Sequence, residues 1–340
     1  MKGKEKYLGI LVLPALLCLV AVGCWQKART LPPQEQGERI ILRYAEVNPK
    51  DHIITQTGQY FADQVQHLSG GRIEIQIYDS GQLGDDSQYY QQMQMGALDM
   101  YRGNTIALTD LPQVQAGILA MPYLFRDDDH FWKVCESSLG KEILEDIQTS
   151  GSGMVGLCYL DEGVRNIMTT GQPVTSLADL KEKQIRSMHS AILEDTLRAL
   201  GAEPVAMGYP DLYSALQSGT VDGAENPVSS YYYNQFYQEA PFYTRSGHTH
   251  APSILLVSEI TWKHLTDADK EILRQAAAKA QEYNRSSLEQ AEKAVYQKLE
   301  ALGITVTELT DPEDWRKAAA EIYETYESRF PGLIERLKGL

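Results

Sequence analysis

The stretch QIRSMHSAILEDTLRALGAEPVAMGYPDLYSALQSGTVDGAENP, residues 184–227, contains two successive strand–helix patterns. A short strand is expected at 184–188, followed by a helix whose leucines recur at i, i+4 and i+7 up to Leu200. A second strand is expected at 204–207, and a second helix ends at Gly219. Consecutive βαβ units of this kind imply parallel strands joined by right-handed crossovers.

Two polar side chains stand near the carboxyl ends of strands in this stretch. Arg186 lies in the strand expected at 184–188, and Asn226 lies just after the turn into the last strand. Open parallel sheets bind ligands beyond the carboxyl ends of their strands. We therefore expect a ligand site that contains Arg186 and Asn226.

Length and composition predict a folded α/β protein with room for two lobes. The chain has 340 residues, a hydrophobic share of 43% and a charged share of 23%. Its formal charge of −15 comes without a run of lysine and arginine. Nucleic-acid binding needs a concentrated basic surface, so the composition argues against a nucleic-acid partner.

The N-terminus has the features of an export signal. Three lysines precede an uncharged, mostly apolar run that ends at Gly23-Cys24, and the run is short for a membrane-spanning helix. Residues 1–23 are therefore interpreted as a signal peptide. The end of the segment resembles a bacterial lipoprotein signal with Cys24 as the lipidated residue, while ordinary cleavage and an uncleaved anchor are the alternatives. Residues 24–39 are polar, contain Pro32-Pro33 and are interpreted as a tether.

Two further cysteines, Cys135 and Cys158, lie beyond the signal and the tether. A disulfide between them is allowed outside the cytosol, and two buried free thiols are an equal alternative. Their spacing matches no metal-binding motif.

The rest of the chain also alternates between strand and helix patterns. Strands are expected at 40–47, 72–78, 98–101 and 155–160, with helices between the first three. Thr266 begins a pattern that resembles a capping box, and no glycine or proline interrupts the chain from there to Leu302. Such a helix is long enough to brace two lobes. A last helix is expected to start at Asp311-Pro312.

No strong catalytic or cofactor signature is present. The chain lacks a nucleophile elbow, a phosphate-binding GxxxxGK[ST] loop and an HExxH motif, so no catalytic residue and no cofactor is assigned. His248 and His250 could offer two metal ligands, but structural roles are preferred and no metal is assigned. The acidic triplet 127–129 before His130 fits either a hard-cation site or, as we prefer, a helix N-terminus.

The two arginines Arg186 and Arg165 carry more weight. A guanidinium near a strand end can hold a carboxylate through two parallel N–H···O bonds, a geometry that lysine cannot reproduce. The alternative for each arginine is an ordinary ion pair with one of the many acidic side chains.

Residues from about 40 to 332 resemble the solute-binding proteins of tripartite ATP-independent periplasmic (TRAP) transporters, the DctP family. The order of the motifs along the chain is also the family's order. The motifs are GGRIEIQIYDSGQLG (70–84), MGALDM (95–100), MPYLF (121–125), GVRNIMTT (163–170), LADLKEKQIR (177–186), RALGAEPVAM (198–207), YSALQSGTVDGAENP (213–227) and SEITWKHL (258–265).

The resemblance implies a periplasmic-binding-protein-like fold of two α/β lobes that closes over its ligand, with the long helix bracing both. It places lobe I at 40–163 plus 252–291 and lobe II at 164–251 plus 292–340. Residues 160–165 and 249–256 would then be the hinge segments.

The resemblance also implies residue roles. The arginine of the K-x-R strand, here Arg186, would bind the ligand carboxylate, Arg165 of the G-x-R segment would be a second positive contact, and Asn226 of DGxEN would hydrogen-bond the ligand. The usual KGxKIR reads KEKQIR here, with Glu182 in place of glycine and Gln184 in place of lysine. This change is expected to alter a turn and to leave Arg186 in position.

The remaining candidates concern the ligand class. Arg102 is a third positive candidate, and Asn104, Glu46 and Asn48 could meet hydroxyl groups. DGAENP followed by a tyrosine-rich stretch resembles members that bind sugar acids, so a hexuronate or aldonate is favoured over dicarboxylates, 2-oxo acids and sialic acid.

The function expected from this resemblance is that of an exported, lipid-anchored protein, in the periplasm or on the outer face of the cytoplasmic membrane. It captures an organic acid and delivers it to a TRAP membrane permease, without chemistry. Its contact with the membrane is expected only through the lipid at Cys24. The alternatives are an exported hydrolase of acidic sugars and a partner of a sensor ectodomain.

Overall fold

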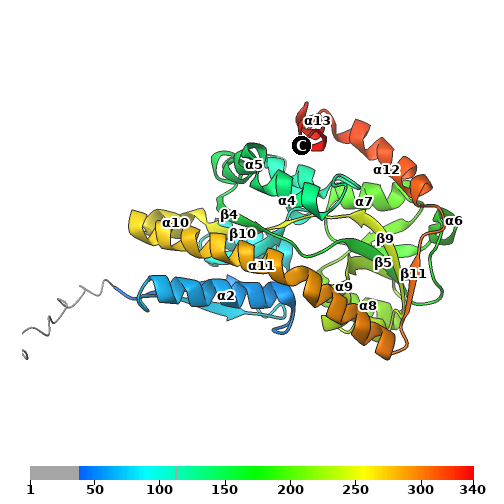
Figure 1. Ribbon diagram of the computed structural model, residues 1–340, viewed down its shortest axis with the longest axis horizontal. Helices are drawn as coiled ribbons and strands as arrows, with labels where there is room; N and C mark the ends of the chain where they lie inside the picture. Colours follow the sequence, from blue (N-terminus) through cyan, green and yellow to red (C-terminus); the bar gives the residue numbers. More distant parts are fainter. Residues whose placement is uncertain (1–37, 112) are drawn as a thin grey trace, which may run out of the picture. The chain divides into compact units, whose positions relative to one another are not determined.

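The computed structural model describes residues 38–111 and 113–340, and residues 40–340 form one compact unit. The signal peptide expected at 1–23, Cys24 and nearly all of the tether lie outside the described residues. The described unit contains two sheets, each covered by helices (Figure 1). This arrangement confirms the predicted α/β fold of two lobes.

The first lobe is built around a five-stranded sheet of order β2-β1-β3-β10-β4. The strands are β1 (Ile40–Ala45), β2 (Ile73–Tyr78), β3 (Met100–Asn104), β4 (Met154–Leu160) and β10 (Ser253–Ser258). Strands β1, β2 and β3 are parallel, and β10 runs antiparallel to both β3 and β4. The helices are α2 (Ile53–Leu68), α3 (Asp86–Gln94), α4 (Asp128–Glu136), α5 (Ser138–Thr149) and α10 (Glu259–His264), with short 3₁₀ helices η1 (Ala107–Asp110) and η2 (Gln115–Ala120).

The second lobe is built around a six-stranded sheet of order β11-β9-β5-β8-β6-β7. The strands are β5 (Arg165–Thr169), β6 (Gln184–Ser187), β7 (Glu203–Ala206), β8 (Gly223–Pro227), β9 (Phe242–Thr249) and β11 (Thr305–Glu308). The helices and 3₁₀ helices among them are α6 (Leu177–Leu180), α7 (Ala191–Ala199), η3 (Tyr209–Asp211), α8 (Leu212–Ser218), α9 (Val228–Tyr233) and η4 (Phe236–Gln238). Strand β6 is parallel to both β7 and β8, which confirms the two βαβ units predicted from residues 184–227. Pro204 is tolerated in β7 because β7 is an edge strand.

The chain crosses between the two sheets at two neighbouring segments. Strand β4 ends in the first sheet at Leu160 and β5 begins in the second at Arg165, while the return crossing joins β9 to β10 between Thr249 and Ser253. Leu160 is in register with Ser253, and Arg165 with Thr249, so the crossings lie side by side. These segments coincide with the predicted hinge.

The long helix α11 (Asp267–Ala301) runs past both lobes (Figure 1). Its N-terminus has the predicted capping box, in which Thr266 and Asp269 satisfy each other's backbone amides. Near its middle, the buried Asn284 accepts a hydrogen bond from the amide of Asp161 at 2.6 Å and donates one to its carbonyl at 3.0 Å. The helix is thus fastened directly to the hinge.

The C-terminal helices return over both lobes. Helix α12 (Pro312–Tyr326) packs against α7, and α13 (Leu333–Lys338) reaches α4, where His130 Nε2 lies 3.0 Å from the carbonyl oxygen of Leu337. The predicted division of the chain into lobes remains a proposal. Helix α13, which it assigns to lobe II, contacts the first lobe through this pair.

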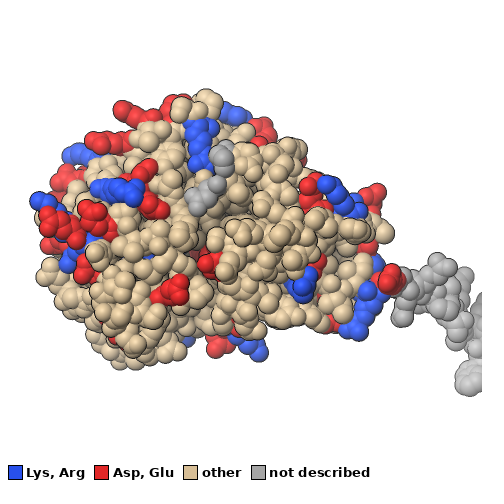
Figure 2. Space-filling view, turned by 180° about the vertical axis from the view of Figure 1, so that it is seen from behind, with Lys and Arg blue, Asp and Glu red and all other residues tan. Residues whose placement is uncertain are grey.

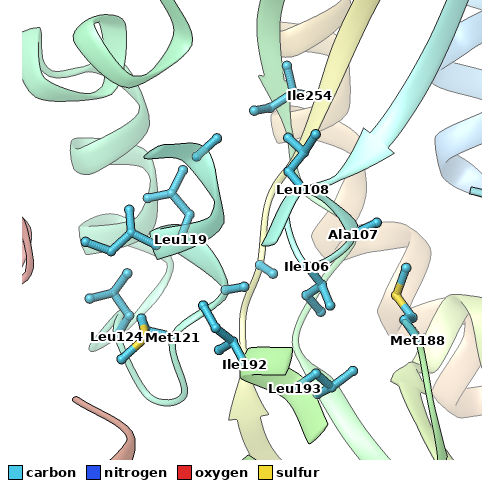
Figure 3. Packing of buried hydrophobic residues seen from close by; sticks show 14 of the residues in the cluster. Ile106, Ala107, Leu108, Leu119, Met121, Leu124, Met188, Ile192, Leu193 and Ile254 are labelled. Atoms are coloured by element: carbon cyan, nitrogen blue, oxygen red, sulfur yellow. The ribbon is translucent and has the colours of Figure 1, made fainter. Parts of the chain in front are cut away.

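Buried apolar side chains continue from one lobe into the other. Ile106 and Leu108 follow β3, and Ile192 and Leu193 belong to α7 of the second lobe, within one buried cluster (Figure 3). On the face shown in Figure 2, most acidic and basic side chains lie toward the edges, and few lie in the broad uncharged area between them.

Both remaining cysteines are buried free thiols, so Cys135 and Cys158 form no disulfide. The acidic triplet is a helix N-terminus as preferred, since Asp127 caps α4 by accepting a hydrogen bond from the amide of His130 at 2.8 Å. Among the described residues, no helix has the length and apolar character needed to cross a bilayer.

Glu182 occupies a position where glycine is expected in the KGxKIR pattern. Its φ is 61°, in the left-handed region, so the turn before β6 keeps the glycine-like backbone with a side chain present. A left-handed conformation costs a residue with a Cβ about 1–2 kcal/mol. Glu182 therefore carries local strain.

We predict that Glu182→Gly stabilises the protein by about 0.5–1 kcal/mol, because relief of the strain exceeds the entropy cost of glycine. Chemical denaturation measures the difference. Lys181→Gly is the matched control and should destabilise, since Lys181 has an ordinary φ of −56°. Equal losses in both variants would contradict the strain argument.

An acidic cavity of about 580 Å³ lies between the two chain crossings and α11. Asp161, Asp128 and Glu292 line it together with His250, whose Nε2 lies 2.8 Å from Asp161 Oδ1. Burial, with the nearby Asp161, raises the pKa of Glu292 to about 7. Between pH 4.5 and about 7, Glu292 is therefore protonated in the folded protein and ionised in the unfolded chain, where it has the ordinary pKa of 4.5.

The consequence is a loss of stability as pH rises from about 4.5 to 7. We predict that Glu292→Gln raises the free energy of unfolding by about 2 kcal/mol at pH 8 and changes it little near pH 4, where both states are protonated. Urea denaturation at the two pH values tests this. The exposed Glu289→Gln serves as control and should have a small effect at both values. A stabilisation by Glu292→Gln that is independent of pH would refute the interpretation.

Candidate functional site

A small cavity lies between the two lobes, close to the hinge. Its volume is about 20 Å³, and we call it the inner cavity. Asn48, Arg102, Asn104, Arg165 and Asn226, all predicted binding residues, line it together with Val47, Asp86, Glu162, Met188, Tyr209 and Ser230. Glu46, also predicted, lies behind it and contacts Arg102. The structure therefore brings these residues together from both sheets.

A larger cavity of about 330 Å³, the outer cavity, adjoins the first. Asp86, Met188 and Tyr209 line both cavities, so the two spaces meet at these side chains. Arg186 lines the outer cavity. It comes from β6, where its register partner on β8 is Ala224, two residues before Asn226. The predicted placement of Arg186 and Asn226 near neighbouring strand ends is confirmed.

Arg102 is neutralised by two carboxylates. Its guanidinium forms an ion pair with Glu46 and donates from Nη1 to Glu162 Oε1 at 2.7 Å and to Ser253 Oγ at 3.2 Å. Burial acts to lower the pKa of Arg102, but the two carboxylates outweigh it and raise the pKa well above its ordinary value. Arg102 can therefore offer a polar surface to a ligand but little uncompensated charge.

Arg165 is neutralised in the same way by one carboxylate. It forms a two-point ion pair with Glu225, in which Nη2 donates to Oε1 at 2.6 Å and also to the Glu225 carbonyl at 3.0 Å. Although burial opposes it, Arg165 lowers the pKa of Glu225 to about 2, so this carboxylate is charged at neutral pH. The pair is buried on β5 and β8 and fixes the floor of the inner cavity.

Arg186 is different. It is 1% exposed, and Nε and Nη2 both donate to the carbonyl oxygen of Met207, at 3.1 and 2.7 Å. Its guanidinium carbon lies 5.5 Å from the ring centre of Tyr209. Within the described part of the chain no carboxylate forms an ion pair with it, and its Nη1 has no hydrogen-bond partner.

An unpaired charge of this kind is costly, because removing a charged group from water requires compensation. Burial lowers the pKa of Arg186, yet a guanidinium remains charged at neutral pH. The guanidinium can therefore bind a carboxylate, which would supply both the missing negative charge and a hydrogen-bond acceptor for Nη1.

Neutral polar groups complete the site. Asn226 has a buried Nδ2 without a hydrogen-bond partner among the described residues. Asn104 donates to Glu162 Oε1 at 2.9 Å, and Asn48 donates to Glu46 Oε1 at 3.1 Å. The amides of Asn104 and Asn48 are held by the same carboxylates that neutralise Arg102, so the orientation of these two side chains is fixed before any ligand arrives.

Hydrogen bonds across the cleft hold the lobes together. His52 Nε2, at the start of α2, lies 3.2 Å from Ser230 Oγ on α9. Asn234 Nδ2, just after α9, donates to Asn48 Oδ1 at 3.2 Å. Burial lowers the pKa of His52 to about 3, so the ring is neutral. Its Nδ1 accepts from the amide of Ile54, which leaves Nε2 as the donor to Ser230.

Sequence reasoning did not identify four polar residues that line the inner cavity: Asp86, Glu162, Tyr209 and Ser230. Asp86 lies in the first turn of α3, where the helix dipole favours an acidic side chain. The structure shows in addition a hydrogen bond from the Tyr101 hydroxyl to its carboxylate. Glu162 is adjacent to the G-x-R segment in sequence, which was the one available signal.

The two histidines considered as metal ligands have separate partners. His248 Nδ1 lies 2.9 Å from Ser246 Oγ, and the ring of His250 stacks on Phe131 with ring centres 4.1 Å apart. Among the described residues, no three histidine, cysteine or acidic side chains are grouped to hold a metal ion.

Comparison with known proteins places this geometry in a family context. A solved TRAP periplasmic solute-binding protein from Pseudomonas putida with bound D-glucuronate is 30% identical, with a TM-score of 0.85 over 88% of this chain and 97% of that one. One from Bradyrhizobium sp. in complex with D-galacturonate is 32% identical, with a TM-score of 0.84 over 88% and 99%. The C4-dicarboxylate-binding protein DctB of Bacillus subtilis is 28% identical over 86% of this chain and 84% of its own length.

The sequence model of one family matches nearly the whole described unit, residues 44–329. Its description is "Bacterial extracellular solute-binding protein, family 7", or DctP. With two lobes joined at a hinge and a buried arginine facing the cleft, the chain belongs to this family of TRAP transporter solute-binding proteins.

Proposed function

We propose that the protein captures a sugar acid, with a hexuronate as the favoured ligand, through a salt bridge between its carboxylate and Arg186. The observation that carries this proposal is the buried guanidinium of Arg186, whose Nη1 has no partner among the described residues. The free amide of Asn226 would meet a ring hydroxyl or the same carboxylate.

Charge balance favours one carboxylate over two. Near Arg186, the cations Arg102 and Arg165 are already paired with acidic side chains, and Asp86 and Glu162 line the cleft. A second ligand carboxylate would lie near these negative groups. Hydroxyl groups, in contrast, can accept hydrogen bonds from the amides and donate them to the carboxylates. A sugar acid uses both kinds of contact.

The ligand requires space at the junction of the two cavities. The inner cavity of about 20 Å³ has room for roughly one water, since a water needs about 10–15 Å³. The ring of a hexuronate is therefore placed at Asp86, Met188 and Tyr209, where the inner and outer cavities meet. Separation of the lobes about the hinge would admit it, with lobe I at 40–163 plus 252–291 and lobe II at 164–251 plus 292–340.

We predict that Arg186→Ala weakens the binding of D-glucuronate or D-galacturonate by at least about a hundredfold, because it removes the charge partner of the carboxylate. Arg186→Lys should give an intermediate loss, since it keeps the charge without the two-point geometry. Titration calorimetry measures both affinities, and circular dichroism verifies that each variant is folded.

Arg198→Ala is the matched control. Arg198 lies on the surface of α7, where it pairs with Glu194 and Asp195, and its loss should leave ligand affinity unchanged. Unaltered binding in Arg186→Ala would remove the basis of the proposal. Tighter binding of succinate than of either uronate would favour the dicarboxylate alternative, and turnover of a bound sugar acid would favour the hydrolase.

The proposal extends to the cell. The protein would be exported, held by a lipid on Cys24 at the outer face of the cytoplasmic membrane, and would deliver its ligand to a TRAP permease. Such anchoring is supported by the lipoprotein-like end of the signal segment.

We predict that Cys24→Ala releases the exported protein from the membrane fraction into the soluble fraction, measured by fractionation and immunoblotting. Cys135→Ala is the control and should stay membrane-bound, because Cys135 is a buried thiol of the folded unit. Release of the unaltered protein by a high-salt wash would argue against a lipid anchor.

A further inference from the structure

The outer cavity extends from Arg186 to the molecular surface. One wall comes from α3 and the segment after β3, with Tyr90, Gln91, Gln94 and Ala107. The opposite wall comes from the ends of β6 and β7 in the second lobe, including Met188 and Met207. Figure 3 shows Ala107 and Met188 on segments from the two lobes.

Several lining residues of this cavity are exposed, which opens it to solvent. Ser87, Gln91 and Gln94 of α3 and His189 after β6 all have exposed side chains. The space is therefore a groove that leads outward from the carboxylate-binding group. A ligand bound at Arg186 can carry a substituent into this groove without meeting buried protein.

The chemistry of the groove selects the substituent. Its walls combine apolar surface from Tyr90, Leu111 and Met207 with the amides of Gln91 and Gln94. Asp85 and Asp86 line the groove as well, and Arg186 is the one arginine or lysine among its described lining residues. Because Arg186 would be occupied by the first carboxylate, a second negative group in the groove would face two aspartates without a counter-charge.

We propose that the outer cavity is a second subsite, which binds the uncharged substituent of a uronic acid glycoside. The preferred ligand is then a uronic acid linked to a neutral sugar or aglycone, with its carboxylate on Arg186 and the neutral part between α3 and the ends of β6 and β7. This inference rests on the proposed function, since it needs the carboxylate at Arg186.

The test compares three ligands with the full folded protein. D-glucuronate reports the carboxylate site alone, phenyl β-D-glucuronide adds an uncharged ring, and digalacturonate adds a second acidic sugar. Titration calorimetry should show that phenyl β-D-glucuronide binds at least as tightly as D-glucuronate. Digalacturonate should bind more weakly than D-galacturonate, because its second carboxylate would lie near Asp85 and Asp86.

A blocking variant locates the effect. Gln91 is exposed on α3, so Gln91→Trp fills the groove without disturbing the core. It should weaken the affinity for phenyl β-D-glucuronide by about tenfold and change the affinity for D-glucuronate by no more than about twofold. Gln66→Trp, at an exposed position of α2 that lines neither cavity, is the matched control and should change neither affinity. Thermal unfolding verifies that both variants are folded.

The outcomes separate the two proposals. Binding of D-glucuronate without the phenyl glucuronide would overturn the subsite and leave the proposed function intact. Equal weakening of both ligands by Gln91→Trp would also overturn the subsite, because the groove would then be part of the primary site. If neither ligand binds, the hexuronate proposal fails and this inference fails with it.

Discussion

The architecture of the cleft depends on a charge that the protein itself does not balance. Three buried arginines face the space between the lobes, and two of them are held by carboxylates: Arg102 by Glu46 and Glu162, and Arg165 by Glu225. Only Arg186 among these three has a carbonyl oxygen and an aromatic face in place of an ion pair. The two neutralised arginines line the inner cavity, and the remaining one is the buried cation that we propose as the partner of an anionic ligand.

The fold explains how such a costly group is kept in position. Arg186 lies on β6, between the parallel strands β7 and β8, and its acceptor Met207 follows directly after the end of β7. The carboxyl ends of these strands open toward the first lobe, which is joined to the second by two crossings beside Asp161 and His250. Rigid strands fix the guanidinium, and the opposite wall of the outer cavity comes from the first lobe.

Much of this arrangement was accessible from local sequence patterns. Periodicity and stop signals predict the parallel strands, the capping box at Thr266 and the strand-end positions of Arg186 and Asn226. The family motifs predict the segments at which the chain crosses between the lobes. The partners of each charge were not accessible. Glu46 and Arg102, for example, are 56 residues apart in sequence and meet only because β1 and β3 are neighbours. A left-handed glutamate at residue 182 was also beyond sequence patterns, since its φ is set by the turn that it must close.

The charged side chains near Arg186 bear on which acids the protein can bind. Arg186 belongs to a motif that is visible in the local sequence, whereas the carboxylates near it come from distant parts of the chain. Asp86 and Glu162 line the inner cavity, and Asp85 and Asp86 line the groove that leads away from it. Each makes a second ligand charge less favourable, because that charge would have no cation left to pair with. Under the proposed function, selectivity for a singly charged, hydroxyl-rich acid would therefore arise from repulsion by the protein's own carboxylates as much as from attraction to one arginine.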